Sequence, residues 1–116
     1  MIKLTNLQIC KRIAEINGDS GHEFMGAFIP SLHFNEVVNE SHNNSYSFCI
    51  DRYAYNPLID DALLNQLILE HEVSINFHFC TLNMVTNKFY EMNFTDIPSL
   101  KRNILLLIIE AHKENV

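Results

Sequence analysis

Apolar positions follow two different periods on either side of residue 72. Between residues 60 and 71 they fall at the three-and-four spacing of an amphipathic helix with one buried stripe. From residue 73 onward they alternate with polar positions, which is typical of a strand with one buried face. The expected buried face consists of Val73, Ile75, Phe77 and Phe79, and the opposite face of Ser74, Asn76, His78 and Cys80. The pattern therefore predicts a helix over 60–71 that leads into a strand over 73–83.

The start of this helix is marked by Asn56-Pro57 and by the acidic pair Asp60 and Asp61. Proline fixes φ and pushes the preceding residue out of the α region. Carboxylates at a helix start accept hydrogen bonds from unpaired N–H groups and interact with the positive end of the helix dipole. Because adjacent helical residues point about 100° apart, we do not expect the pair to share a proton as a catalytic dyad. We expect both mainly to be helix-start residues.

Two further helices are predicted, over 5–17 and 98–113. Thr5 or Asn6 can cap the first helix, and Asn17-Gly18 provides a left-handed stop. The last helix tolerates Pro98 because this residue lies in the first turn. Its apolar residues cover most of the circumference and are Leu100, Ile104, Leu105, Leu106, Leu107, Ile108, Ile109 and Ala111. Such a helix is either buried on both sides within one subunit or covered by a partner, and we expect a homodimer or a host-protein contact through 98–113.

Two further strands are predicted, over 46–51 and 89–94, because apolar and polar residues alternate there. Thr86-Asn87 lies between two such runs and predicts a hairpin turn. Residues 18–34 are expected to form a loop that holds a short extended piece. Residues 35–45 are mostly polar and are expected to form a solvated loop, with a short helix capped by Asn35 as the alternative.

These elements predict an α+β fold in a single domain over 1–116. The sheet is expected to be mostly antiparallel, built from 46–51, 73–83 and 89–94, with flanking helices. A strongly apolar face opposite a polar one is typical of an antiparallel sheet that is covered on one side. Small residues on the polar face would let a helix pack there as well, so a three-layer α-β-α sandwich is the alternative.

Composition and charge exclude several function classes. The 116 residues carry 14 acidic and 8 basic side chains, a net charge of −6, and we expect no direct contact with nucleic acid, because lysine and arginine supply that affinity. The longest apolar run, 104–109, is far shorter than the ~20 residues that span a membrane, and no signal peptide is recognisable. Three cysteines are consistent with reduced thiols. We therefore expect a protein of the host-cell cytoplasm.

Candidate chemistry is sparse. The sequence has no glycine-rich phosphate loop and no recognisable catalytic or metal-binding motif. His78 and Cys80 share the polar face of the predicted strand, and His33 or His22 could join them, but zinc requires three or four converging ligands. We expect free cysteines, no metal, no cofactor and no enzymatic activity.

The best candidate for an interface is the tyrosine pair Tyr53 and Tyr55, which follows an expected strand. Tyrosine is enriched among the residues that dominate binding energy. Acidic side chains on segments expected to be exposed would form a steering rim, and they are Glu36, Glu40, Asp60 and Asp61. The alternatives are that both tyrosines close the end of the core and that the carboxylates are a solvated face.

The segment 55–79 also resembles a known family. The turn N-P-L-x-D-D at 56–61, the apolar helix after it and the following strand are similar to the signature of the NinX-like phage and prophage proteins, a family of unknown function. Related proteins are described as the phage α-β-α sandwich domain. The resemblance extends over the hairpin at 73–94 and the closing helix at 98–113, and it implies origin and fold rather than mechanism.

Two functional hypotheses follow. The first is a phage- or prophage-encoded accessory protein that binds and disables a host protein without catalysis, in the manner of anti-CRISPR or anti-restriction proteins. Its partner would be a host defence component, for example one that binds nucleic acid. The alternative is a small-ligand or nucleotide-handling protein of phage metabolism, which a deep pocket lined by His78, Asn76 and a tyrosine would favour.

Overall fold

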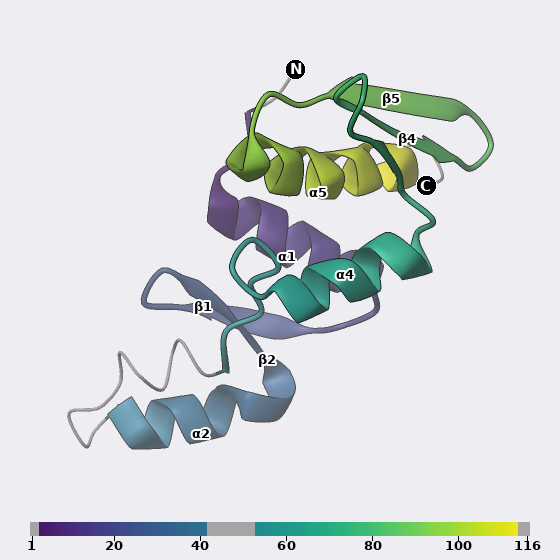
Figure 1. Cartoon of the computed structure of the whole chain (residues 1–116). Coiled ribbons are helices and arrows are strands. Elements are labelled where there is room, and N and C mark those ends of the chain that lie inside the picture. Colours follow the sequence, from purple (N-terminus) through teal and green to yellow (C-terminus); the bar gives the residue numbers. More distant parts are fainter. Residues whose placement is uncertain (1–2, 42–52, 114–116) are drawn as a thin grey trace. The chain divides into compact units, whose positions relative to one another are not determined.

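A computed structural model of the chain describes residues 3–41 and 53–113, with the side chains of residues 40 and 41 excepted. Within these ranges the chain is an α+β protein with four helices and two small antiparallel sheets, as the sequence predicts (Figure 1). It divides into two compact units, Met1–Asn56 and Pro57–Val116. A compact unit need not fold independently, so the single domain over 1–116 stays a prediction.

The first unit begins with helix α1 (Asn6–Ile16), which Thr5 caps. The Thr5 hydroxyl accepts from the Gln8 backbone N–H (3.2 Å), and the Gln8 side chain accepts from the Thr5 N–H (2.9 Å). This reciprocal pair satisfies two N–H groups that the helix start leaves without intrahelical partners. Asn17 ends the helix, and Gly18 follows with a φ of 83°. The predicted helix over 5–17 is therefore confirmed.

A β-hairpin and a helix complete the first unit. Strands β1 (Gly21–Phe24) and β2 (Ala27–Pro30) pair antiparallel. The two residues between them, Met25 and Gly26, both have positive φ, at 52° and 82°, as tight hairpin turns require. Helix α2 (Ser31–Ser41) follows directly.

The expectation of a loop with one extended piece over 18–34 is therefore wrong, and so is the expectation of a solvated loop over the described part of 35–45. Packing explains the helix in this polar stretch. Val37 and Ile29 are fully buried and form a small core with Phe24 and Phe34. One apolar contact of this kind can fix a helix whose sequence alone would not hold it. The predicted strand over 46–51 lies outside the described residues.

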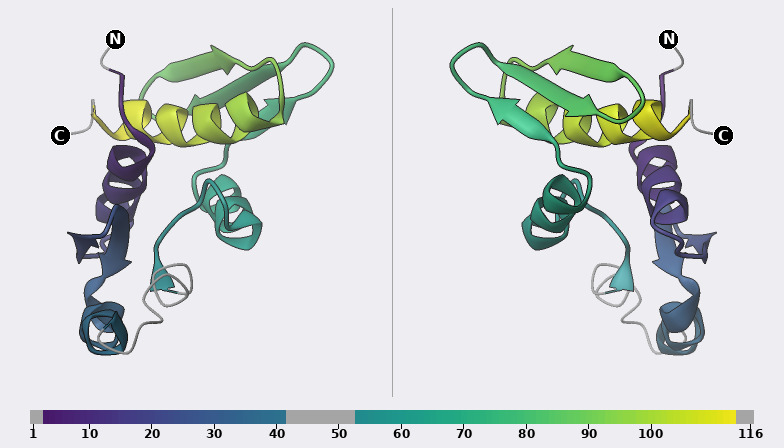
Figure 2. Two further views of the ribbon diagram at one scale, coloured as in Figure 1. Left: turned by 90° about the vertical axis from the view of Figure 1, so that its left-hand side faces the viewer. Right: turned by 90° about the vertical axis from the view of Figure 1, so that its right-hand side faces the viewer.

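The second unit contains helix α4 (Asp61–Glu70), strands β3 (Ser74–Asn76), β4 (Thr81–Val85) and β5 (Phe89–Asn93), and helix α5 (Ile97–Lys113). The strands form one antiparallel sheet in the order β3-β4-β5. Helix α5 runs along one face of β4 and β5 in every view (Figures 1 and 2). On that face Leu82 and Met84 are buried. The predicted helices over 60–71 and 98–113 and the hairpin turn after residue 85 are thus confirmed.

The predicted strand over 73–83 is wrong in one respect, because residues 77–80 form a turn that divides it into β3 and β4. The alternation of faces therefore ends at Asn76. Phe77 and Phe79, which the pattern assigned to the buried face, are 65% and 70% exposed. Asn76 provides the physical reason, because its side chain binds the backbone of the turn and competes with continuation of the strand.

The face of this sheet opposite α5 carries the polar residues Ser74, Asn76, Glu91 and Asn93 and, at the hairpin end, the apolar residues Val85 and Phe89, all of which are exposed. Polar residues on an exposed face agree with a sheet that is covered on one side. The three-layer sandwich is not confirmed.

Helix α5 buries apolar residues around most of its circumference within a single chain. The buried residues are Leu100, Ile104, Leu105, Leu107, Ile108, Ile109 and Ala111. The homodimer or host-protein contact through 98–113 stays a prediction. None of the helices in the described ranges has the length and apolar character that crossing a membrane requires.

Candidate protein-interaction site

The second unit presents an aromatic turn, which we define as residues Phe77, His78, Phe79 and Cys80, between β3 and β4. All four residues are exposed. The His78 and Phe79 rings meet nearly at right angles, with their centroids 4.7 Å apart. Phe77 rests edge-on against Phe94, with centroids 5.9 Å apart. Two phenylalanines, 65% and 70% exposed, therefore stand at the tip of this turn.

The backbone of the aromatic turn is fixed by local hydrogen bonds. The Asn76 side-chain oxygen accepts from the backbone N–H groups of His78 (3.0 Å) and Phe79 (3.1 Å). Asparagine forms this arrangement readily because its short side chain reaches the N–H groups two and three residues ahead. The Cys80 thiol lies 3.7 Å from the Phe77 carbonyl oxygen. The backbone that carries the two exposed rings is therefore preformed.

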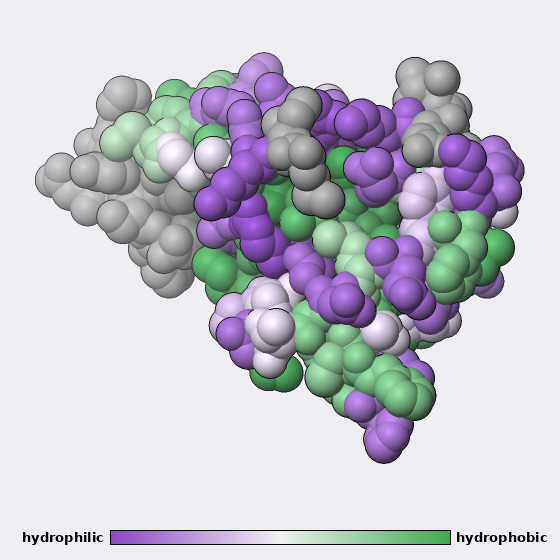
Figure 3. All heavy atoms as spheres, turned by 90° about the horizontal axis from the view of Figure 1, so that it is seen from above, coloured by the Kyte–Doolittle hydropathy of each residue, from purple (hydrophilic) through white to green (hydrophobic). Residues whose placement is uncertain are grey.

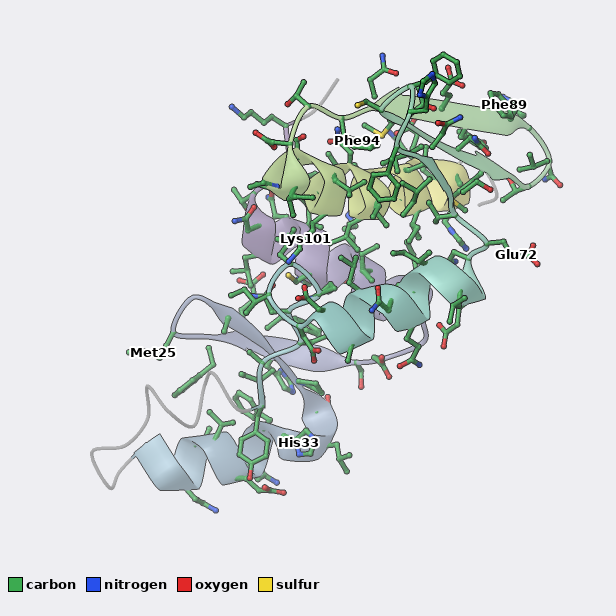
Figure 4. All side chains as sticks on the ribbon, in the orientation of Figure 1. Met25, His33, Glu72, Phe89, Phe94 and Lys101 are labelled. Atoms are coloured by element: carbon green, nitrogen blue, oxygen red, sulfur yellow. The ribbon has the colours of Figure 1, made fainter. Side chains whose placement is uncertain are left out.

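The end of the aromatic turn is joined to the sheet. Cys80 has a φ of 53°, in the left-handed region that non-glycine residues rarely adopt. Its carbonyl oxygen accepts from the Phe94 N–H (3.0 Å), directly after β5 ends. Phe94 itself is buried (Figure 4). Because a rigid sheet supports it, the turn would lose little conformational entropy on binding.

The tyrosines predicted as anchors are half-buried in the first unit. The Tyr53 ring stacks on His33, with centroids 4.8 Å apart and planes 25° apart. The Tyr55 backbone N–H donates to the Phe28 carbonyl oxygen (2.9 Å), and the Tyr55 hydroxyl accepts from the Asn17 side chain (3.4 Å). Both tyrosines thus help to close this unit, and their role as anchors stays a prediction.

Among the predicted rim residues whose side chains are described, Glu36 is linked to a predicted anchor through His33. Its carboxylate is 3.9 Å from His33 Nδ1, and the His33 ring stacks on Tyr53. Nδ1 is itself buried and has no hydrogen-bond partner among the described residues. The contact is therefore an ion pair only when His33 is protonated. The side chain of Glu40, another predicted rim residue, lies outside the described residues.

Asp60 and Asp61 lie in the second unit and have different roles. Asp60 is the N-cap of α4, and its carboxylate accepts from the Leu63 N–H (3.1 Å). Asp61 points elsewhere and pairs with Lys101 of α5, with 2.7 Å between Oδ1 and Nζ. Both residues are exposed. The prediction that they mark the helix start is confirmed for Asp60 as the cap and for Asp61 as the first helical residue.

The two described cysteines have different surroundings. Cys10 is buried in α1, and burial raises the pKa of its thiol to about 11. Its Sγ lies 3.4 Å from the Asn56 side-chain oxygen. Cys80 is exposed and belongs to the aromatic turn. Among residues 3–41 and 53–113, no three His, Cys, Asp or Glu side chains are arranged to hold a metal ion.

Sequence reasoning missed the aromatic turn because it contains no glycine or proline. A signal was nevertheless present, since a strand over 73–83 would be about twice the usual length of 5–6 residues. Asn76 is the residue in that run best suited to start a turn.

Exposed hydrophobic residues appear in separate groups among hydrophilic ones at the surface (Figure 3).

Comparison with known proteins adds no relative to this description. No family model, curated protein or solved structure matches the chain significantly, so the resemblance of residues 55–79 to the NinX-like family stays a prediction.

Proposed function

We propose that this chain is a non-enzymatic accessory protein that acts by binding another protein through the aromatic turn. The observation that carries the proposal is the exposure of Phe77 and Phe79, at 65% and 70%, on a turn that is already fixed. Burying one phenylalanine side chain stabilises a complex by about 2–3 kcal/mol. Two such rings, on a turn whose backbone is fixed before binding, have the properties of an interface hot spot.

Charge supports a partner with a basic surface. The net charge of −6 would accelerate encounter with such a protein and repel anionic ones. Proteins that grip nucleic acid are basic where they contact phosphates. A nucleic-acid-binding component of host defence is therefore the kind of partner that we propose.

The biological setting of the proposal comes from the resemblance of 55–79 to phage and prophage proteins. This resemblance supports a phage or prophage origin, and with it we propose an inhibitor of host defence, of the anti-CRISPR or anti-restriction type, that acts in the host cytoplasm. In this setting small size, an acidic surface and an exposed aromatic anchor serve one purpose, which is to occupy a basic functional surface of the target.

A quantitative pull-down from host lysate tests the proposal. We expect the wild-type chain to capture a discrete host protein, and Phe79→Ala to reduce the captured amount at least about tenfold, as the loss of ~1.4 kcal/mol or more implies. Leu69→Ala is the matched control, because Leu69 is 78% exposed on α4 of the same unit. Equal capture by wild type and Phe79→Ala would contradict binding through the aromatic turn, and specific turnover of a small molecule would contradict the non-enzymatic reading.

The same assay tests the residues that the sequence suggested. The variants are Tyr53→Ala, Tyr55→Ala and a charge-reversed Asp60/Asp61 pair. If Tyr53 or Tyr55 is an anchor, its alanine variant loses capture while the fold, followed by circular dichroism, is retained. If the carboxylates only steer, charge reversal slows association and leaves dissociation unchanged.

A further inference from the structure

Strand β5 forms an edge of the sheet in the second unit. The order β3-β4-β5 gives β5 one neighbour, and no described strand lies on its other side. The opposite edge is β3, which has only three residues, whereas β5 has five. An edge strand presents unpaired backbone groups that can template another strand.

Two hydrogen bonds at the ends of the β4–β5 ladder identify which groups of β5 face outward. The Thr86 N–H donates to the Lys88 carbonyl oxygen, and the Phe94 N–H donates to the Cys80 carbonyl oxygen, both at 3.0 Å. In an antiparallel ladder, residues that bond to the partner strand alternate with residues that do not. Lys88 and Phe94 therefore fix the phase of the ladder.

With this phase, Tyr90 and Met92 bond to β4, and Phe89, Glu91 and Asn93 direct their N–H and C=O groups away from it. The Asn93 carbonyl oxygen already accepts from the side chain of Asn103 (2.7 Å). The N–H and C=O groups of Phe89 and Glu91 and the N–H of Asn93 remain as the pairing groups of the edge.

The same residues also place their side chains on the exposed face of the sheet. Phe89 is 61% exposed at the hairpin end of β5 (Figure 4). Glu91 lies at the centre of the strand and Asn93 at its far end, next to the aromatic turn through the contact of Phe94 with Cys80. The edge thus offers an apolar group, a negative charge and backbone donors and acceptors in a fixed order.

We propose that β5 is a docking edge to which an extended segment of a partner protein adds as a fourth strand, with a lysine or arginine opposite Glu91 and an apolar side chain opposite Phe89. This inference rests on the proposed protein-binding function and names how the partner is held. Strand addition combines backbone hydrogen bonds, which give affinity, with alternate side chains, which give selectivity.

Charge is the reason to assign the edge to a different protein rather than to a second copy of this chain. The symmetric pairing of two β5 strands that uses Phe89, Glu91 and Asn93 places Glu91 directly opposite Glu91 of the copy. Like charges directly opposite each other destabilise a strand pair. A basic residue opposite Glu91 has the reverse effect, so the same carboxylate rejects one partner and selects another.

Continuity with the aromatic turn strengthens this assignment. Five strand residues at about 3.4 Å each bring an added strand from Phe89 to the end of the sheet where Cys80 lies. A partner segment on β5 would then continue toward Phe77 and Phe79. The edge supplies register along the strand, and the turn supplies an apolar anchor at its end.

Selection of random eight-residue peptides displayed on yeast, with the purified chain as bait, tests the inference. We expect enriched peptides to carry lysine or arginine two positions from an apolar residue, because alternate side chains share a face. Glu91→Pro removes the outward N–H and leaves the ladder to β4 intact, as edge strands tolerate. It should weaken binding of the enriched peptides at least about tenfold.

Charge exchange and backbone methylation provide the sharper controls. Glu91→Lys should lose the basic peptides and enrich acidic ones, while Glu110→Lys, the same change at an exposed position of α5, should keep the original preference. Methylating the N–H groups of every second peptide residue gives two sets of peptides. The set in which the methylated N–H groups face β5 should lose binding, and the set in which they face away should keep it. Enriched peptides that bind wild type and Glu91→Pro equally, or an absence of enriched peptides, would overturn strand addition.

The outcomes separate this inference from the proposed function. A host protein whose capture depends on Phe79 but is unchanged in Glu91→Pro would keep protein binding through the aromatic turn and overturn the role of β5. The opposite outcome is that peptides with the expected pattern are enriched while wild type and Phe79→Ala capture equal amounts of the host protein. It would support strand addition to β5 and contradict binding through the aromatic turn. Size-exclusion chromatography with light scattering gives a third readout, because a dimer that dissociates in Glu91→Pro would replace the partner segment with a second copy.

Discussion

The imidazole rings of His71 and His112 lie edge to face in the second unit, with 5.0 Å between their centroids and 88° between their planes. His71 caps the C-terminal end of α4, and His112 lies in the last turn of α5. His112 Nδ1 is 2.9 Å from the Ile108 carbonyl oxygen. Because a carbonyl oxygen only accepts, Nδ1 carries the proton. The pair therefore joins the C-terminal ends of two helices.

This arrangement predicts a loss of stability in mild acid. Burial lowers the pKa of His71, a positive charge on His112 lowers it further, and Glu70 opposes both effects. The unfolded chain therefore binds a proton more readily than the folded chain as the pH falls below about 6.5. The unfolding free energy should therefore decrease as the pH falls below about 6.5. Above that pH, the titration of His71 should leave the unfolding free energy unchanged.

Urea unfolding between about pH 5 and pH 8 measures the effect. His71→Gln should flatten the dependence below about 6.5. His78→Gln is the matched control, because His78 lies on the exposed aromatic turn of the same unit. A slope that persists unchanged in His71→Gln would show that other groups cause it.

Local signals in the sequence were sufficient to locate α1, α4 and α5. For α1 and α4 a cap and an apolar stripe agreed, as in the pairing of Thr5 with Gln8 at the start of α1, and for α5 the apolar pattern itself was long enough. The α+β class and the β4–β5 hairpin were predicted for the same reason, because alternation and a turn signal coincided. Agreement between several local preferences makes such predictions dependable.

The elements that were missed depend on contacts that no local pattern records. Helix α2 forms in a polar stretch because Val37 packs against Ile29, which lies on a strand that the sequence also concealed. The aromatic turn was hidden because Phe77 and Phe79 continue the alternation of β3 although the chain has already turned. A candidate site on exposed phenylalanines could not be predicted while the pattern placed the same rings in the core.

Asp60 and Asp61 should differ in how they stabilise α4. Asp60→Ala removes the cap that accepts from Leu63 and should lower the unfolding free energy by about 1 kcal/mol, whereas Asp60→Asn retains a capping oxygen and should cost little. Asp61→Asn removes the ion pair with Lys101. Because the Asp61 side chain is 71% exposed, this loss should cost at most ~1 kcal/mol. Denaturation at low and high salt separates them, because the Asp61 effect should disappear with screening, whereas the lost capping hydrogen bond of Asp60→Ala should persist at high salt. A loss in Asp60→Asn as large as that in Asp60→Ala would contradict the capping role.

Gly21 should be the least replaceable glycine of the first unit. A Cβ at this position would lie 2.4 Å from the Ile29 carbonyl oxygen and 2.7 Å from the Phe28 ring, so backbone would have to move. We expect Gly21→Ala to cost about 2–3 kcal/mol. Gly26→Ala, with a φ of 82° and no atom within 4 Å, should cost about 1 kcal/mol from backbone strain alone. Thermal unfolding compares the two variants, and an equal cost would mean that the hairpin shifts without penalty.

The two described cysteines should react at very different rates. Burial raises the pKa of Cys10 to about 11, while Cys80 is exposed, and the thiolate is the reactive form. In a Cys49→Ser background near pH 8, we expect a chromogenic disulfide reagent to modify Cys80 first and Cys10 only as the chain opens. Denatured wild type should return all three thiols of the sequence. Equal native rates would indicate that α1 is open to solvent.

Asn76 should control binding through the preorganisation of the aromatic turn. Asn76→Ala removes the oxygen that accepts from the His78 and Phe79 N–H groups, yet both residues are exposed, so water can replace it and the unfolding free energy should fall by only ~1 kcal/mol. The turn would then sample many conformations, and binding would have to order it again.

We therefore expect Asn76→Ala to weaken binding of the captured partner about tenfold, mostly through faster dissociation. Asn76→Asp keeps an acceptor at the same position and should retain most of the affinity. Amide exchange measured by NMR gives a readout that needs no partner, since the His78 and Phe79 amides should lose protection in Asn76→Ala and keep it in Asn76→Asp. Fast amide exchange combined with unchanged affinity would mean that the order of the turn does not contribute to recognition.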